Sequence, residues 1–260
     1  NVVQCPAVGA LEHPSPVAAI INLLFAPFHI HVPDHVVFSG LITLFILGIG
    51  LAIRSKLSVE NPGKLQIILE DLVTFMAGVL EGNMGPRGRQ YLPLLGTLFV
   101  FILLGNLMGQ IPGLGSPTGN INVPFACAIT LWLYYHWQGI KANGPIGYLK
   151  HFGVMPGVPV ILSPLIFVIE IISHMSRVLS LTLRLFGNIF GEHLVVLIIA
   201  SIIPFILPLP IQFLGLIVGP LQAFIFMTLG AIYLTAATHV DHHGDEMGGV
   251  EGHHPHANAH

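Results

Sequence analysis

Long runs of apolar residues, separated by short polar segments, dominate this chain. Residues 36–53 form an uncharged apolar run after Pro33-Asp34, and residues 91–111 and 123–140 form two further runs. About 20 apolar residues in an α-helix suffice to cross the hydrocarbon core of a bilayer. The pattern therefore predicts three membrane helices in this part of the chain.

Residues 62–82, between the first two predicted spans, have a different pattern. Their apolar positions share one face of a helix, and the charged positions lie elsewhere. These apolar positions are Leu65, Ile68, Leu69, Leu72, Phe75, Met76 and Val79. Such a helix is typical of the membrane–water interface, so we expect residues 62–82 to lie on the membrane surface.

The fifth hydrophobic element is too long for an upright span. Residues 158–203 contain no polar loop, and a helix of that length, at about 1.5 Å per residue, exceeds twice the thickness of the hydrocarbon core. This element is either strongly tilted or broken at a point that the sequence hides. Residues 211–238 are predicted to form the next membrane helix, which runs back across the bilayer after a corner at Pro204, Pro208 and Pro210. The predicted fold is all-α and polytopic, with about five membrane helices plus the interfacial helix.

Composition supports a membrane protein. Of the 260 residues 53% are hydrophobic and only 8% are charged, whereas soluble domains contain about 25% charged residues. This deficit excludes an ordinary soluble enzyme, and no basic stripe suggests a nucleic-acid partner. There is no nucleotide-phosphate loop, so no nucleotide chemistry is expected within this chain. Cys127 lies in an apolar run, so a disulfide with Cys5 is not expected.

The basic residues predict the topology. Seven of the nine Lys and Arg residues lie in two loops, residues 54–90 and 141–158, while residues 112–121 have no charge. By the positive-inside rule these two loops are cytoplasmic, which places the N-terminal segment 1–33 outside. Residues 1–240 are expected to form a single membrane domain, and the tail, residues 241–260, is cytoplasmic by parity.

The tail combines several His residues with Gly and acidic residues, and we expect it to be disordered. His-rich tracts can bind metals, but no fixed ligand spacing appears, so no metal site is predicted.

Polar side chains recur along one side of the fifth element. Glu170, Arg177 and Arg184 are seven residues apart, close to two helical turns, so they share a face. Further polar residues lie between or beyond them, namely Ser173, His174, Ser180, Asn188, Glu192 and His193. Such a face avoids hydrocarbon, so it is expected to meet another protein or a water-filled cavity.

Arg184 is the central residue of this stripe. Its guanidinium stays protonated, and an Arg at the centre of a membrane helix costs about 2.5–3.5 kcal/mol on insertion scales. No acid lies three or four residues away, and Glu192 is eight residues on. We therefore expect its counter-charge to come from another chain. A carboxylate beside Arg releases its proton, which indicates proton or sodium handling.

Arg177 and Gln222 each allow more than one interpretation. Arg177 either supports the polar path or merely pairs with Glu170 or with the headgroup layer. Gln222, in the last span, either lies beside Arg184 or serves only to bond two helices together.

These segments resemble subunit a of the F-type ATP synthases, the membrane stator that faces the rotating c-ring. The resemblance rests on residues 180–188 (SLTLRLFGN), residues 221–227 (LQAFIFM) and Asn106-Leu-Met108 followed by Pro112, and its form looks bacterial or plastid-like. It covers roughly residues 17–239.

The resemblance implies a role for each polar residue. Arg184 would be the essential arginine that interacts with the c-subunit carboxylate and blocks leakage between two aqueous half-channels. Glu170, Ser173 and His174 would line the cytoplasmic half-channel, with Arg177 and Ser180 in support. The outer half-channel would be lined by Asn188, Glu192, His193 and Gln222.

The resemblance also implies the setting of the chain. Its partners would be the c-ring, the peripheral-stalk subunit b and the rest of the ATP synthase, in the bacterial inner membrane and without a cofactor. The long fifth helix would lie nearly horizontally against the ring, in a hairpin with the sixth.

The chain departs from some members of this family at two glycines. Gly109 stands where some have an acid, and Gly215 where some have a His. Which of Glu192 and His193 dominates the outer half-channel is therefore open, as is the choice between protons and sodium. A stand-alone secondary transporter, usually built from internal repeats, and a structural scaffold are the competing functions. No convincing repeat is present, and the polar stripe argues against a scaffold.

Overall fold

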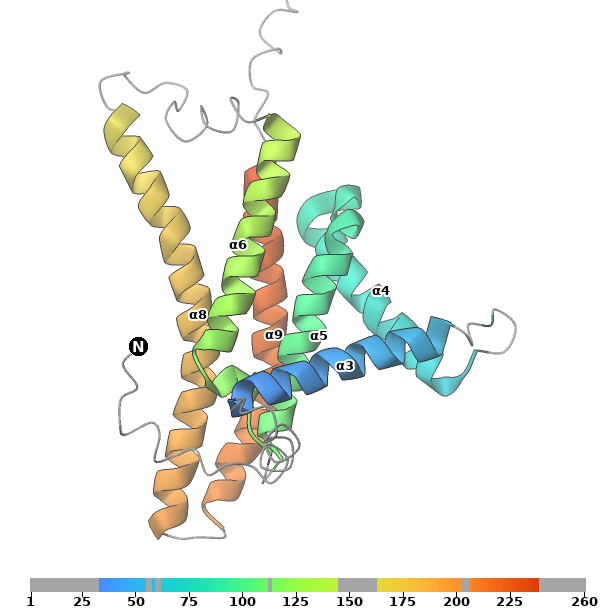
Figure 1. Cartoon of the computed structure of the whole chain (residues 1–260), viewed down its shortest axis with the longest axis vertical. Coiled ribbons are helices and arrows are strands. Elements are labelled where there is room, and N and C mark those ends of the chain that lie inside the picture. Colours follow the sequence, from blue (N-terminus) through green and yellow to red (C-terminus); the bar gives the residue numbers. More distant parts are fainter. Residues whose placement is uncertain are drawn as a thin grey trace, which may run out of the picture.

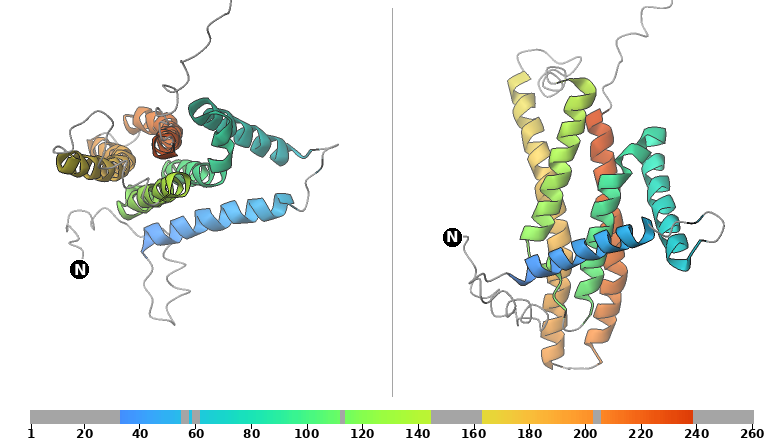
Figure 2. Two further views of the ribbon diagram at one scale, coloured as in Figure 1. Left: turned by 90° about the horizontal axis from the view of Figure 1, so that it is seen from above. Right: turned by 45° about the vertical axis from the view of Figure 1, so that its right-hand side comes forward.

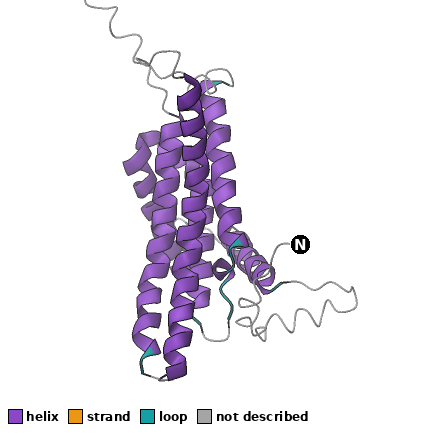
Figure 3. Cartoon of the chain, turned by 90° about the vertical axis from the view of Figure 1, so that its left-hand side faces the viewer, coloured by secondary structure: helices purple, strands orange, loops and turns teal. Residues whose placement is uncertain are grey.

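The computed structural model describes residues 33–54, 58, 62–111, 114–144, 163–202 and 206–238. Within these ranges the chain is helical and contains no strand, which confirms the all-α prediction (Figure 3). Six α-helices and two short 3-10 helices make up the described part: α3 (Asp34–Arg54), α4 (Lys64–Met84), η2 (Gly85–Tyr91), α5 (Leu92–Gly109), η3 (Pro117–Gly119), α6 (Asn122–Asn143), α8 (Ser163–Ile202) and α9 (Pro208–Thr238).

Four helical stretches of the described chain are long and apolar enough to cross a membrane, which confirms a polytopic membrane protein. They are α3, the stretch Lys64–Gly109 that joins α4 to α5, α8 and α9. Helix α6, predicted as a span, is not among the four. Its second half contains His136, Gln138 and Lys141, which lower its mean hydropathy.

Helix α8 is continuous through 40 residues. At about 1.5 Å per residue it is about 60 Å long, twice the hydrocarbon thickness of about 30 Å. The described residues contain no break in it, so α8 fits within the membrane only if it is strongly tilted. Helices α8 and α9 form a long antiparallel hairpin, and α3 lies across the bundle (Figures 1 and 2).

Helix α9, the second arm of the hairpin, begins earlier than expected. Helix α9 starts at Pro208, so Pro208 and Pro210 lie in its first turn instead of forming a corner before residue 211. Proline is tolerated in the first turn because the N–H groups there have no helical acceptor. Pro204 and the expected helix start at residue 158 lie outside the described residues, as do Cys5, residues 1–32 and the tail.

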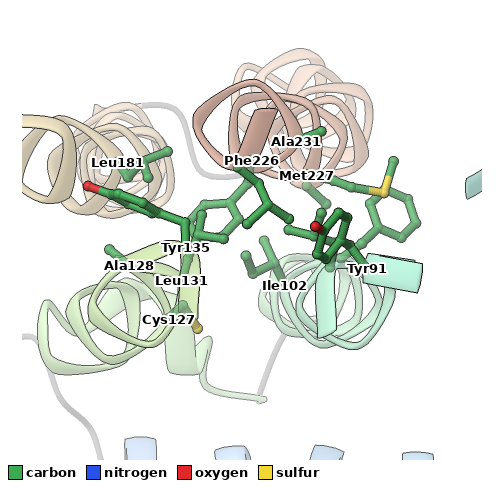
Figure 4. Packing of buried hydrophobic residues seen from close by; sticks show 14 of the residues in the cluster. Tyr91, Ile102, Cys127, Ala128, Leu131, Tyr135, Leu181, Phe226, Met227 and Ala231 are labelled. Atoms are coloured by element: carbon green, nitrogen blue, oxygen red, sulfur yellow. The ribbon is translucent and has the colours of Figure 1, made fainter. Parts of the chain in front are cut away.

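The core lies where α5, α6, α8 and α9 meet. Ile102, Leu131, Leu181 and Phe226, one from each of these helices, are among its buried side chains (Figure 4). Helix α9 approaches α5 and α6 closely at Gly230, where a Cβ atom would lie 2.8 Å from the side chain of Leu95. This packing holds one face of α8 against the bundle and leaves the opposite face uncovered.

Candidate functional site

The buried side of α8 determines which way its polar residues face. Val178, Leu181, Leu185 and Ile189 recur every three or four residues and are buried against the bundle. Arg184 is exposed beside this buried row. No acidic side chain of the described residues lies within 4.0 Å of its guanidinium nitrogens.

The surface around Arg184 is shallow. Ser180, one turn earlier, and Gly187, one turn later, are both exposed. A Cβ atom added to Gly187 or to Gly191 would meet nothing within 4 Å. An apolar helix with small residues on either side of one cation permits close approach by a further helix.

Asn188 and Gln222 join α8 to α9. The Asn188 side-chain amide donates a 2.7 Å hydrogen bond to Oε1 of Gln222, and Gln222 is only 2% exposed. Its Nε2 has no hydrogen-bond partner within the described chain. The bond therefore fastens the two helices one turn beyond Arg184, and it leaves one buried donor for a further group.

Glu192 points inward, toward α9. A Cβ atom added to Gly215 would fall on the carboxyl group of Glu192, so this carboxyl group occupies the space where a side chain of α9 would otherwise lie. Glu192 is half-buried, whereas its neighbour His193 is exposed. The two candidate groups at this end of α8 thus have different surroundings.

A buried polar network beside this region was missed as part of the site by sequence reasoning. Asn106 is fully buried in α5, donates to the carbonyl of Gly219 at 3.0 Å and accepts from Thr118 at 2.8 Å. Thr118 in turn shares a 2.8 Å bond with Ser116. An Asn inside an apolar run was the available signal, because a buried amide needs partners.

The same network explains Gly109, one of the two positions at which the chain departs from some members of the family that it resembles. A Cβ atom at Gly109 would lie 2.6 Å from Cβ of Ser116. Glycine is therefore the residue that lets this loop close onto α5, and an acid at that position would displace Ser116.

A second polar cluster lies near the start of α8. Nε2 of His174 is 3.2 Å from Oε1 of Glu170, and its Nδ1 is 2.8 Å from the hydroxyl of Tyr135 on α6. The guanidinium carbon of Arg177 lies 5.1 Å above the ring of Tyr233 on α9, a cation–π contact. Among the described residues Glu170 pairs with His174 and not with Arg177, so the alternative of a Glu170–Arg177 ion pair is wrong.

The site residues therefore fall into two clusters on either side of Arg184. Glu170, His174 and half-buried Ser173 precede it, and Asn188, Glu192 and Gln222 follow it. Along the helix axis Glu170 is about 21 Å and Glu192 about 12 Å from Arg184, at about 1.5 Å per residue. No group of three or more His, Cys, Asp or Glu side chains in the described ranges could hold a metal ion.

Comparison with known proteins identifies the family. The family model described as ATP synthase A chain matches residues 36–235, most of the chain. The chain belongs to the ATP synthase A chain family. It is 41% identical to ATP synthase subunit a 3 of Pelobacter propionicus over 89% of this chain and 100% of the relative. It is 44% identical to ATP synthase subunit a of Nitratidesulfovibrio vulgaris, over 78% of this chain and 85% of the relative.

A third relative matches the chain over a similar length. ATP synthase subunit a 1 of Syntrophotalea carbinolica is 38% identical over 89% of this chain and 95% of its own length. The matched residues of the ATP synthase A chain model include Tyr135, both clusters on α8 and Gln222. The whole candidate site therefore lies within the part of the chain that is shared with the family.

Proposed function

We propose that this chain is the stator of a proton path in the membrane sector of an ATP synthase. It would provide two aqueous half-channels to and from a rotating c-ring and so couple the ion gradient to ATP synthesis in partner subunits. The observation that carries the proposal is Arg184, a permanent cation exposed on an apolar helix, with no acid of the described chain beside it.

The partner of Arg184 is a carboxylate on a c subunit. A cation near a carboxylate favours its ionised form, so a c-subunit acid that reaches Arg184 releases its proton there. The same charge repels protons and so blocks a direct leak between the two half-channels. The small residues around Arg184 support this role, because they let a second helix approach closely.

Each half-channel is lined by one of the two polar clusters on either side of Arg184. Glu170, Ser173 and His174, with Arg177 and Ser180 in support, serve the cytoplasmic side. The outer side is served by Asn188, Glu192, His193 and Gln222. We assign the dominant outer role to Glu192 rather than His193, since the Glu192 carboxyl group lies against α9 between the helices.

The charges and the family support the proposed setting. Seven of the nine Lys and Arg residues lie in the two loops that the positive-inside rule assigns to the cytoplasm. The N-terminus is accordingly outside and the C-terminus inside, in a bacterial inner membrane. The c-ring and the peripheral-stalk subunit b are the proposed neighbours within the ATP synthase.

Replacement of Arg184 tests the proposal. In membrane vesicles, Arg184→Ala is expected to abolish ATP synthesis and to raise passive proton leak through the membrane sector. Arg184→Lys keeps the positive charge but loses the planar guanidinium group. This variant should therefore block proton leak better than Arg184→Ala but still support little ATP synthesis. Arg89→Ala removes an exposed arginine paired with Glu81 and serves as the matched control. Retained synthesis without leak in Arg184→Ala would refute the proposal.

A further inference from the structure

Tyr135 is a buried polar residue that the proposed path does not yet use. It lies on α6, is 1% exposed, and its hydroxyl is 2.8 Å from Nδ1 of His174. In Figure 4 the hydroxyl end of Tyr135 points from α6 toward α8, where Leu181 lies. The Tyr135 and His174 rings are also stacked, with centroids 5.7 Å apart. Two helices thus meet at one phenol–imidazole hydrogen bond.

The direction of this hydrogen bond follows from chemistry. A carboxylate only accepts hydrogen bonds, so the ring nitrogen that faces Glu170 carries the N–H, and the Tyr135 hydroxyl donates to the other nitrogen, Nδ1. A neutral imidazole has a single N–H, which is then on Nε2. Nε2 faces Oε1 of Glu170 at 3.2 Å, the geometry of an N–H donor to a carboxylate.

We infer that Tyr135 and His174 are positioning residues that hold the Glu170 carboxyl group in place, and that neither of them relays the proton. A relaying imidazole takes up a proton on one nitrogen and releases one from the other. Because Nδ1 accepts from Tyr135, His174 stays a fixed donor and Glu170 is the group that exchanges protons. This inference rests on the proposed cytoplasmic half-channel and assigns the roles within it.

The groups around this contact favour a fixed arrangement. The ring of His136 on α6 lies 4.9 Å from that of His174, and its Nδ1 is 3.0 Å from the carbonyl of Trp132. Arg177, which could have competed for Glu170, lies over the ring of Tyr233 on α9. Arg177 thus contacts α9, and His174 is the ion-pair partner of Glu170.

Removal of the hydroxyl alone tests Tyr135. Tyr135→Phe keeps the ring packing, and passive proton flux through the membrane sector of vesicles is expected to fall about fivefold, the factor that corresponds to one ordinary hydrogen bond. Tyr134→Phe is the matched control, since the Tyr134 hydroxyl has no hydrogen bond within the described chain and its ring lies edge-on to Tyr91. Unchanged flux in Tyr135→Phe would overturn the inference.

Two replacements of His174 separate positioning from relay. Glutamine can donate an N–H to Glu170 but cannot take up a proton, so His174→Gln should retain most of the flux and His174→Leu should lose it. Equal loss in both would make His174 a relay and overturn the inference. In the His174→Leu background Tyr135→Phe should have no further effect, because coupled residues are not additive.

The outcome for Glu170 distinguishes failure of this inference from failure of the proposed function. Glu170→Gln should abolish most flux if the cytoplasmic half-channel exists. Normal flux in both Glu170→Gln and Arg184→Ala would refute the proposed function itself. Loss of flux in Glu170→Gln and raised leak in Arg184→Ala, with Tyr135→Phe unaffected, would refute only the positioning roles of Tyr135 and His174.

Discussion

Gly215→Ala is expected to impair proton flux with little effect on stability. Gly215 is buried in α9, and a Cβ atom there would fall on the carboxyl group of Glu192. That group is the far end of a flexible side chain, so the methyl group can be accommodated if Glu192 rotates away and the backbone stays in place. The substitution thus moves the proposed outer-channel acid without removing it.

The expected energies nearly cancel. Replacement of Gly by Ala inside a helix gains about 0.5–1 kcal/mol, and a Glu side chain forced off its rotamer costs about 0.5–1.5 kcal/mol. The free energy of unfolding should therefore change by less than about 1 kcal/mol. Flux should fall about tenfold to a hundredfold, because displacement of a reacting group by about 1 Å can have an effect of this size.

Two other glycines provide matched controls. Gly78→Ala, inside α4 and away from the site, gains the same helix propensity and meets nothing within 4 Å, so flux should stay normal. Gly230→Ala places a Cβ atom 2.8 Å from Leu95 and 3.2 Å from Leu131. Overpacking of this kind costs about 1–3 kcal/mol, so it should lower the melting temperature and the yield.

Thermal unfolding in detergent and proton flux in vesicles, both normalised to the amount of assembled protein, measure these effects. Normal flux in Gly215→Ala would refute the assignment of Glu192. So would an equal loss of flux in Gly78→Ala, because that variant leaves the Glu192 carboxyl group where it is.

Three further predictions concern buried groups. Gln222→Leu removes the hydrogen bond from Asn188 and should lower the free energy of unfolding by about 0.5–1.5 kcal/mol, the value of one ordinary hydrogen bond; a fully stable variant in thermal unfolding would contradict this. Asn106→Leu removes the acceptor of Thr118, so a loss of similar size is expected by the same assay. Cys127 is 6% exposed, so a maleimide should label it slowly in the native protein and rapidly after denaturation. Rapid native labelling would show that the core around α6 opens.

Much of the fold could be read from local composition. An apolar run long enough to cross a bilayer must become a helix, since hydrocarbon cannot satisfy unpaired backbone groups. Arg184 could likewise be singled out without a structure, because a fixed charge amid apolar residues conflicts with its own surroundings. The start of α9 could not be read this way, since Pro208 and Pro210 suit both a corner and a first helical turn.

The pairings within the site depended on distant parts of the chain. Asn106 bonds to Gly219, 113 residues away, and Tyr135 to His174, 39 residues away. A periodic pattern reports which face of a helix is polar, but it does not report which neighbour that face will meet.

The sequence by itself determined that this is an all-α membrane protein. It also determined that Arg184, on the fifth hydrophobic element, has no acidic residue near it in the same segment. Both properties follow from the composition of single segments. The tertiary structure decided that α8 is unbroken from Ser163 to Ile202, that Glu170 pairs with His174, and that the carboxyl group of Glu192 lies against Gly215. These features arise only when α5, α6, α8 and α9 pack together, since side-chain contacts across helices depend on how the helices cross.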